Sequence, residues 1–102
     1  MTNAHLTSVL AKTVMGWSVS PSRFMMDARR WLPRWRFQPL SRIEDAFRLL
    51  QQASPMEYSI AASQSGDYTV KVRIGDTTGV AREASQPLAI TLAIARAVGI
   101  EV

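Results

Sequence analysis

The feature that most constrains the fold is a pair of alternating segments joined by a short polar turn. Within residues 68–74, and more weakly within 58–62, every second side chain is apolar. A period of two predicts a strand with one buried and one solvated face. Gln64-Ser65-Gly66-Asp67 predicts a hairpin turn, and Gly75-Asp76 leads into a third strand at about residues 78–84. The chain should therefore contain a three-stranded antiparallel meander that needs cover on one face.

Two segments before this meander have the pattern of amphipathic helices. Apolar residues within 3–15 recur at helical spacing, Thr2 or Asn3 can cap the start, and Gly16 can end the helix. The second helix begins at Ser41-x-x-Glu44, which matches a capping box. It ends at Ser54-Pro55, because proline disfavours helical backbone in the residue before it.

A third helix follows the meander and is apolar nearly all round. Ser85 is its expected cap, Pro87 lies in its first turn, and Gly99 closes it. Such a helix is buried on more than one side, so one face should pack on the sheet and the other on the first two helices or a second subunit. For a homodimer, the predicted interface residues are Leu88, Leu92 and Arg96.

The order of elements, α-α-β-β-β-α, predicts an α+β fold in which helices pack on the meander. The 102 residues fit one domain, 1–102, with one core. Four aromatic residues at helix or strand periodicity are predicted to belong to this core: Trp17, Phe47, Tyr58 and Tyr68.

Residues 18–38 break the helical pattern and hold the excess positive charge of the chain. Segment 21–37 has five arginines and one acid, Asp27, whereas the remaining chain has seven basic and seven acidic residues. Four of the eight aromatic residues also lie here, between prolines that interrupt any long helix. The segment is therefore predicted to be a long basic and aromatic loop, or an excursion with one short helix.

Catalytic and metal chemistry lack the residues they need. The chain has no cysteine, one histidine (His5), no G-x-S-x-G elbow and no phosphate-binding glycine loop. We therefore expect no metal, no cofactor and no enzymatic activity. The N-terminus lacks a basic, continuously apolar leader, and no stretch has the length of a membrane span, so a cytoplasmic location is expected.

Three stretches resemble the phage ABA-sandwich family of small phage and prophage proteins. They are LAKTVMGW at 10–17, PLSRIEDAF at 39–47, and ASQPLAI at 84–90 running to AVGIEV at 97–102. Where the family tends to have an acid after the capping position, this chain has Arg42, and its variable loop is unusually rich in arginine. The resemblance implies an ABA-sandwich-like fold and phage origin, and it transfers no catalytic residues.

The arginine and tryptophan content of 23–37 is the strongest functional signal. Both residue types are enriched at binding hot spots, which predicts partner binding by Arg23, Arg29, Arg30, Trp31, Arg34, Trp35 and Arg36. We interpret the chain as an inhibitor of a host defence activity, such as an anti-CRISPR protein, that contacts a host protein. Direct nucleic-acid binding and an oligomeric sponge for an anionic nucleotide remain open alternatives, as does burial of the aromatic rings in the core.

Overall fold

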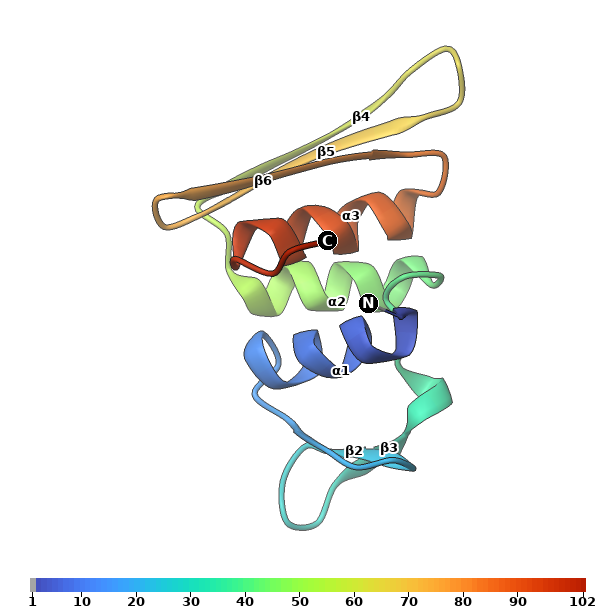
Figure 1. The fold of residues 1–102 in the computed structure, drawn as a ribbon, viewed down its shortest axis with the longest axis vertical. Coiled ribbons are helices and arrows are strands. Elements are labelled where there is room, and N and C mark those ends of the chain that lie inside the picture. Colours follow the sequence, from blue (N-terminus) through green and yellow to red (C-terminus); the bar gives the residue numbers. More distant parts are fainter. Residues whose placement is uncertain (1) are drawn as a thin grey trace.

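The computed structural model describes residues 2–102 as three helices between two antiparallel sheets (Figure 1). The helices are α1 (Asn3–Thr13), α2 (Ile43–Ala53) and α3 (Gln86–Ala97). The smaller sheet holds β1 (Ser18–Val19), β2 (Arg23–Met25) and β3 (Trp31–Pro33), which is followed by the 3-10 helix η1 (Arg34–Arg36). The larger sheet holds β4 (Glu57–Ala62), β5 (Tyr68–Ile74) and β6 (Thr77–Glu83). The sheets lie at opposite ends of a molecule that is 44 Å long (Figure 1).

The larger sheet is the meander that the alternating segments predicted. Its strands pair in the order β4-β5-β6, and the inward side chains Val70, Val72 and Ala81 are fully buried or nearly so. At Gly79 strand β6 lies directly against α3, since a Cβ atom there would lie 2.0 Å from the Ala93 carbonyl oxygen. The sheet and α3 can approach this closely only because residue 79 has no side chain.

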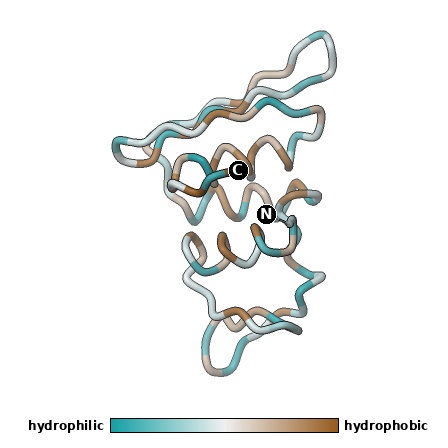
Figure 2. The backbone as a smooth tube through the Cα atoms, in the orientation of Figure 1, coloured by the Kyte–Doolittle hydropathy of each residue, from teal (hydrophilic) through white to brown (hydrophobic). Residues whose placement is uncertain are grey.

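Helix α3 packs against β5 and β6 on one side and against α2 on the other, which accounts for its apolar composition (Figures 1 and 2). Ala89 and Ala93, one turn apart, are fully buried, as are Ile90 and Ile94. The buried hydroxyl of Thr91 donates to the Pro39 carbonyl oxygen at 2.7 Å. The larger sheet and α2 of the same chain therefore cover the two sides of α3.

Most of the predicted helix ends are confirmed. The Thr2 hydroxyl accepts from the His5 N–H at 3.1 Å, and the Ser85 hydroxyl accepts from the Leu88 N–H at 3.4 Å. Ser54 adopts the left-handed conformation, with φ of 49°, at the end of α2. Each of these ends is a contact between residues close in sequence, which is why the sequence could predict it.

The predicted capping box at Ser41 and Glu44 was wrong. Helix α2 begins at Ile43, and the Ser41 hydroxyl donates to Gln38 Oε1 at 3.2 Å instead of capping the helix. Residues 38–42 form a turn of their own, in which the Arg42 N–H donates to the Gln38 carbonyl at 2.8 Å. Asp45, in the first turn of α2, accepts from the Gln38 N–H at 2.9 Å. Ser41 therefore bonds within this turn instead of capping α2, and the Asp45 carboxylate, not Glu44, holds the turn against the helix.

Residues 18–36 form the smaller sheet and η1, whereas the sequence predicted a long basic and aromatic loop or an excursion with one short helix over residues 18–38. The pairing is antiparallel in the order β1-β2-β3. Phe24 points inward from β2 and packs with Trp17 and Phe37, with ring centroids 5.0–5.8 Å apart. Phe24 and Phe37 are fully buried. This aromatic cluster anchors the sheet to the helices.

Two of the four aromatic residues predicted for the core are exposed. Trp17 is buried and Tyr68 packs against the core, as expected. In contrast, 39% of Phe47 and 53% of Tyr58 is exposed to solvent. Periodicity assigned each residue to an apolar face, but Phe47 and Tyr58 line an open hollow at the surface instead of packing into the core.

Candidate functional site

The outer face of the smaller sheet carries the first part of the candidate site. Met25 pairs with Trp31 in the register of β2 and β3, so both side chains point away from the buried Phe24. The Trp31 side chain is 51% exposed, and the Arg23 guanidinium lies 5.3 Å from its ring centroid. These two residues are diagonal neighbours on adjacent strands, which places cation and ring together.

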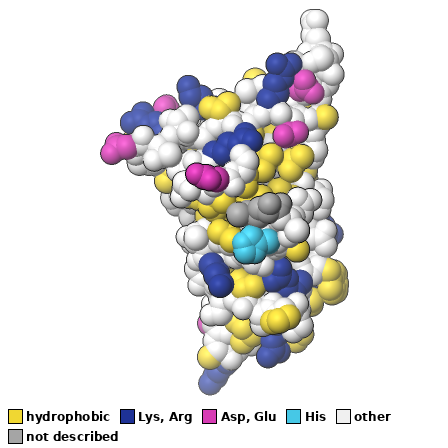
Figure 3. All heavy atoms as spheres, in the orientation of Figure 1, with side chains coloured by type: hydrophobic (Ala, Val, Ile, Leu, Met, Phe, Trp, Pro, Cys, Tyr) yellow, Lys and Arg dark blue, Asp and Glu magenta, His cyan; other side chains and the backbone are white. Residues whose placement is uncertain are grey.

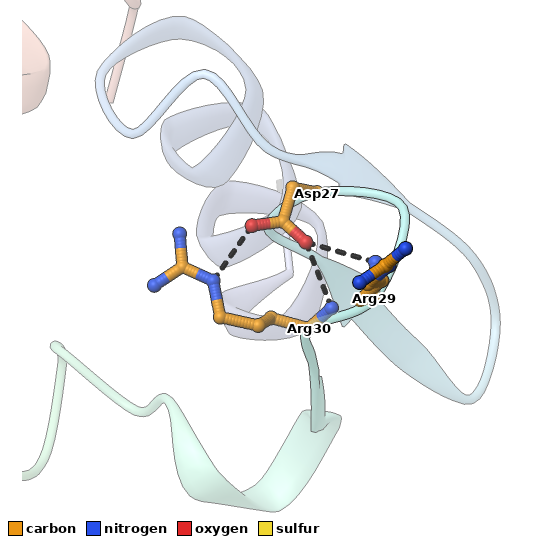
Figure 4. A network of polar contacts seen from close by, with 3 residues as sticks. All are labelled: Asp27, Arg29 and Arg30. Atoms are coloured by element: carbon orange, nitrogen blue, oxygen red, sulfur yellow. Dashed lines mark hydrogen bonds and ion pairs between the residues drawn. The ribbon is translucent and has the colours of Figure 1, made fainter.

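The turn between β2 and β3 is held by one carboxylate (Figure 4). Asp27 Oδ1 accepts from the backbone N–H groups of Arg29 and Arg30 at 2.8 and 2.9 Å, and Oδ2 accepts from Arg30 Nε at 2.6 Å. The N–H of Arg29, followed by the side chain and N–H of Arg30, lowers the pKa of Asp27 from its ordinary value of 3.8. The ionised carboxylate therefore fixes the turn and leaves the Arg29 guanidinium free to project.

We expect this turn to loosen in acid. Because the folded-state pKa of Asp27 is lowered, ionisation stabilises the turn above pH 3.8, and this contribution is lost as the pH falls through the lowered value. In an NMR titration, the amide signals of Arg29 and Arg30 should shift toward their unbonded positions together with protonation of Asp27. The variant Asp27→Asn should lack this acid transition. If the two amide signals of wild type did not change as Asp27 is protonated, Asp27 would not be the group that holds the turn.

The second part of the site is η1, where Trp35 is the most exposed tryptophan, at 62%. The Arg36 guanidinium lies 5.5 Å from the Trp35 ring centroid. Trp35 borders two hollows. One, of about 370 Å³, has an apolar floor that includes Phe24, Phe37 and Leu40. The other, of about 410 Å³, is lined by Leu32, Trp35, Arg36, Arg42, Glu44, Asp45 and Arg48.

Arg34 was predicted to bind a partner, but its guanidinium is engaged within the chain. Nη2 donates to Ser8 Oγ at 2.6 Å and to the Ala4 carbonyl at 3.2 Å, and Nη1 donates to the Ser20 carbonyl at 3.3 Å. The same group lies 4.8 Å from the Phe24 ring centroid. Arg34 therefore joins the smaller sheet to α1, and its guanidinium is not part of the exposed candidate site.

Arg42 and Arg48 lie beside Trp35 and Arg36, although the sequence predicted neither as a site residue. They reach this hollow because the turn at 38–42 folds the start of α2 back against η1. Arg48 also stacks on the buried Trp17, with its guanidinium 5.0 Å from the ring centroid. No local pattern could have linked them to residues 35 and 36, because their proximity depends on the course of the intervening loop.

We call the exposed set the Arg/Trp surface. Its members are Arg23, Arg29, Arg30, Trp31, Trp35 and Arg36. Among residues 2–102, the one ion pair that involves this set joins Arg30 to Asp27. Residues 2–43 carry seven basic residues and one acidic residue, whereas residues 44–102 carry five and seven. Figure 3 shows the result, with blue and yellow side chains at the end formed by β2 and β3 and most of the magenta nearer the larger sheet.

The residues predicted for an oligomer interface lie on α3, away from this surface. Leu88 and Leu92 are half-buried against the core, and Arg96 donates to the carbonyl oxygens of Val80 and Val102 at 2.7 and 3.2 Å. Within residues 2–102, no group of three or more His, Cys, Asp or Glu side chains is arranged to hold a metal ion. No helix in the same range is long and apolar enough to cross a membrane.

The fold and surface define a small α+β protein with a cationic, aromatic face at one end. The chain belongs to the phage ABA sandwich domain family, whose model matches residues 8–94. Its fold is similar to that of a phage protein from Bacillus cereus ATCC 14579, known from a 2.0 Å crystal structure. The two share 18% identity with a TM-score of 0.79, over 100% of this chain and 92% of the other, a likeness that shows the fold. A search of curated proteins gave no significant match.

Proposed function

We propose that this phage protein acts without catalysis in the host cytoplasm, by binding a host protein through the Arg/Trp surface and inhibiting it. A host defence complex is the target that best suits a phage-encoded inhibitor. The observation that carries the proposal is the exposure of both Trp31 and Trp35 on elements that the buried aromatic cluster anchors. Exposed indoles lose the stability that burial would give, and tryptophan and arginine are the residues most enriched at binding hot spots.

The support beneath the surface favours a preformed site. Phe24 and Phe37 fix the inner side of the smaller sheet, Arg34 ties it to α1, and Asp27 fixes the turn that carries Arg29. A surface that is already ordered loses little conformational entropy when it binds. The hollows on either side of Trp35 can receive side chains of a partner, and the excess of arginine favours one with an acidic surface.

The test compares wild type with the variant Trp31→Ala/Trp35→Ala as bait for nuclease-treated host lysate. Each protein retained by wild type is then titrated against both baits. We expect the double variant to weaken binding by roughly a hundredfold or more, because a hot-spot side chain contributes about 2 kcal/mol and 1.4 kcal/mol is tenfold. The matched control is Met56→Ala/Val80→Ala, which removes two exposed apolar side chains outside the Arg/Trp surface and should bind as wild type does.

Two outcomes would overturn the proposal. If the double tryptophan variant retained the partner with unchanged affinity, the Arg/Trp surface would not be the site. If nuclease abolished recovery, and purified protein shifted single-stranded nucleic acid with an affinity that falls as salt rises, the ligand would be nucleic acid and not protein.

A further inference from the structure

The two edges of the larger sheet differ in how they are protected. The β6 edge is covered near its middle, where Arg96 Nη1 donates to the Val80 carbonyl oxygen at 2.7 Å. Strand β4, at the other edge, has one charged residue, Glu57, and no lysine, proline or bulge within 57–62. Natural proteins use such devices to stop an exposed edge from pairing with another strand. Because β4 lacks a lysine, a proline and a bulge, its edge is suited to pairing with another strand.

The direction of the backbone groups in β4 follows from its pairing with β5. The Ser63 N–H donates to the Asp67 carbonyl oxygen at 2.9 Å, one position beyond the Ala62–Tyr68 pair. Hydrogen-bonded and non-hydrogen-bonded pairs alternate along an antiparallel ladder. The residues whose backbone N–H and C=O groups bond to β5 are therefore Glu57, Ser59 and Ala61. The residues whose N–H and C=O groups face the open edge are therefore Tyr58, Ile60 and Ala62. Continued across β5, the same alternation points the Val80 carbonyl outward, in agreement with its bond to Arg96.

We propose that the β4 edge pairs antiparallel with the β4 edge of a second copy of this chain, about a two-fold axis at Ile60. In this register Ile60 faces Ile60 of the partner subunit, and Tyr58 faces Ala62 of the partner subunit. All three residues with outward backbone groups then occupy hydrogen-bonded positions, so each N–H and C=O gains a partner. The two sheets join into one continuous sheet.

The side chains suit this register on both faces. On the helix-facing side, the large ring of Tyr58 meets the small Ala62 of the partner subunit. On the opposite side, Ser59 faces Ala61 of the partner subunit and Glu57 faces Ser63 of the partner subunit, so no like charges meet. A second copy is thus complementary to the edge along the whole strand, which is why we assign the edge to self-pairing and not to an unrelated strand.

Exposed apolar side chains gather beside the same edge. Met56 is 67% exposed immediately before β4. Tyr58 and Phe47 line a hollow of about 320 Å³ together with Leu50, Gln51 and Pro55. In the dimer, the partner strand lies alongside Tyr58 and reduces the exposure of this apolar group. The pairing therefore accounts for the exposed ring of Tyr58.

The decisive test is a charge-swap series followed by sedimentation velocity, with the mass of one chain being 11.3 kDa. Wild type should sediment with twice that mass. The variant Ser59→Glu/Ala61→Glu places carboxylates opposite each other across the axis and should raise the dissociation constant by roughly tenfold or more. Within one chain the new carboxylates face Lys71 and Thr69, so the monomer fold should remain intact.

The matched control reverses one charge. Ser59→Glu/Ala61→Lys puts opposite charges across the axis and should restore the wild-type dissociation constant or lower it. The variant Thr78→Glu/Val80→Glu, on the β6 edge, should leave the dimer unchanged. A chain that stays monomeric at its highest soluble concentration would overturn the proposal, as would a dimer that the double glutamate variant leaves intact.

A covalent readout keeps the test valid if the charged variants fold poorly. The chain has no cysteine, so Ile60→Cys introduces a single thiol at the proposed axis. Residues in a hydrogen-bonded antiparallel pair have Cα atoms about 5.5 Å apart, within the range that a disulfide spans. Mild oxidation should convert Ile60→Cys to a covalent dimer but leave the β6 control Val80→Cys monomeric. Equal cross-linking of both variants would contradict the assigned register.

Discussion

Replacing Gly79 with alanine is expected to lower the free energy of unfolding by about 3 kcal/mol or more, at the upper end of the effects of overpacking. The new Cβ atom would lie 2.0 Å from the Ala93 carbonyl oxygen and 2.5 Å from the Ala97 nitrogen. Both are backbone atoms of α3, so no side-chain rotation relieves the clash and the helix must move away from the sheet. That movement would open the core around Val72, Ala89 and Ala93.

Urea denaturation and thermal melting of Gly79→Ala measure this effect. A loss of about 3 kcal/mol corresponds to a fall in Tm of roughly 12 °C or more for a domain of this size. The control is Val80→Ala, the next residue in β6, whose side chain is exposed on the other face and should change stability little. Equal stability of Gly79→Ala and wild type would show that α3 does not approach the sheet this closely.

The second large effect is expected for Phe24→Ala, which should cost about 3–5 kcal/mol. Phe24 is fully buried, and its ring contacts Trp17, Phe37 and the Arg34 guanidinium. Short strands such as β1, β2 and β3 are not stable without an apolar face to pack on. Loss of this ring should therefore release the smaller sheet, and the Arg/Trp surface with it, before the larger sheet unfolds.

Denaturant titration and NMR spectra resolve the two parts of that prediction. Signals of residues 18–36 should lose their dispersion at lower urea concentration than those of β5 and β6. Trp31→Ala is the matched control, because it removes a larger ring from the same sheet, but one that is half exposed; it should cost less than about 1 kcal/mol. If Trp31→Ala destabilised the protein as much as Phe24→Ala, the inward and outward faces of the sheet would be assigned wrongly.

The helix ends show what could be predicted without tertiary structure, and where such prediction fails. The caps at Thr2 and Ser85 are confirmed because each is a bond within one turn of the helix that it begins. Ser41 has the same local sequence signal, yet it bonds to Gln38, because the loop packed under Thr91 offers a competing partner. A local signal holds only where no neighbouring turn competes for the same side chain.

Composition located the segment that holds the candidate site, but only the packing of the chain shows which of its side chains are exposed. The density of arginine and tryptophan in 23–37 singled out the segment that carries the Arg/Trp surface. Nothing in that composition distinguishes Arg34, which bonds to α1, from Arg36, which is exposed. The strands of the smaller sheet are two or three residues long, too short to show an alternating pattern, so their register could not be predicted.

The sequence by itself determined the order of the helices, the larger meander, most helix caps and the imbalance of charge, because each depends on residue type and on contacts between near neighbours. Only the tertiary structure decided which apolar faces are covered, which arginines are engaged, and that β4 is an open edge while β6 is covered by Arg96. Those outcomes depend on how closely segments distant in the sequence approach one another. Closeness of approach is set by packing, as the contact of Gly79 with α3 demonstrates.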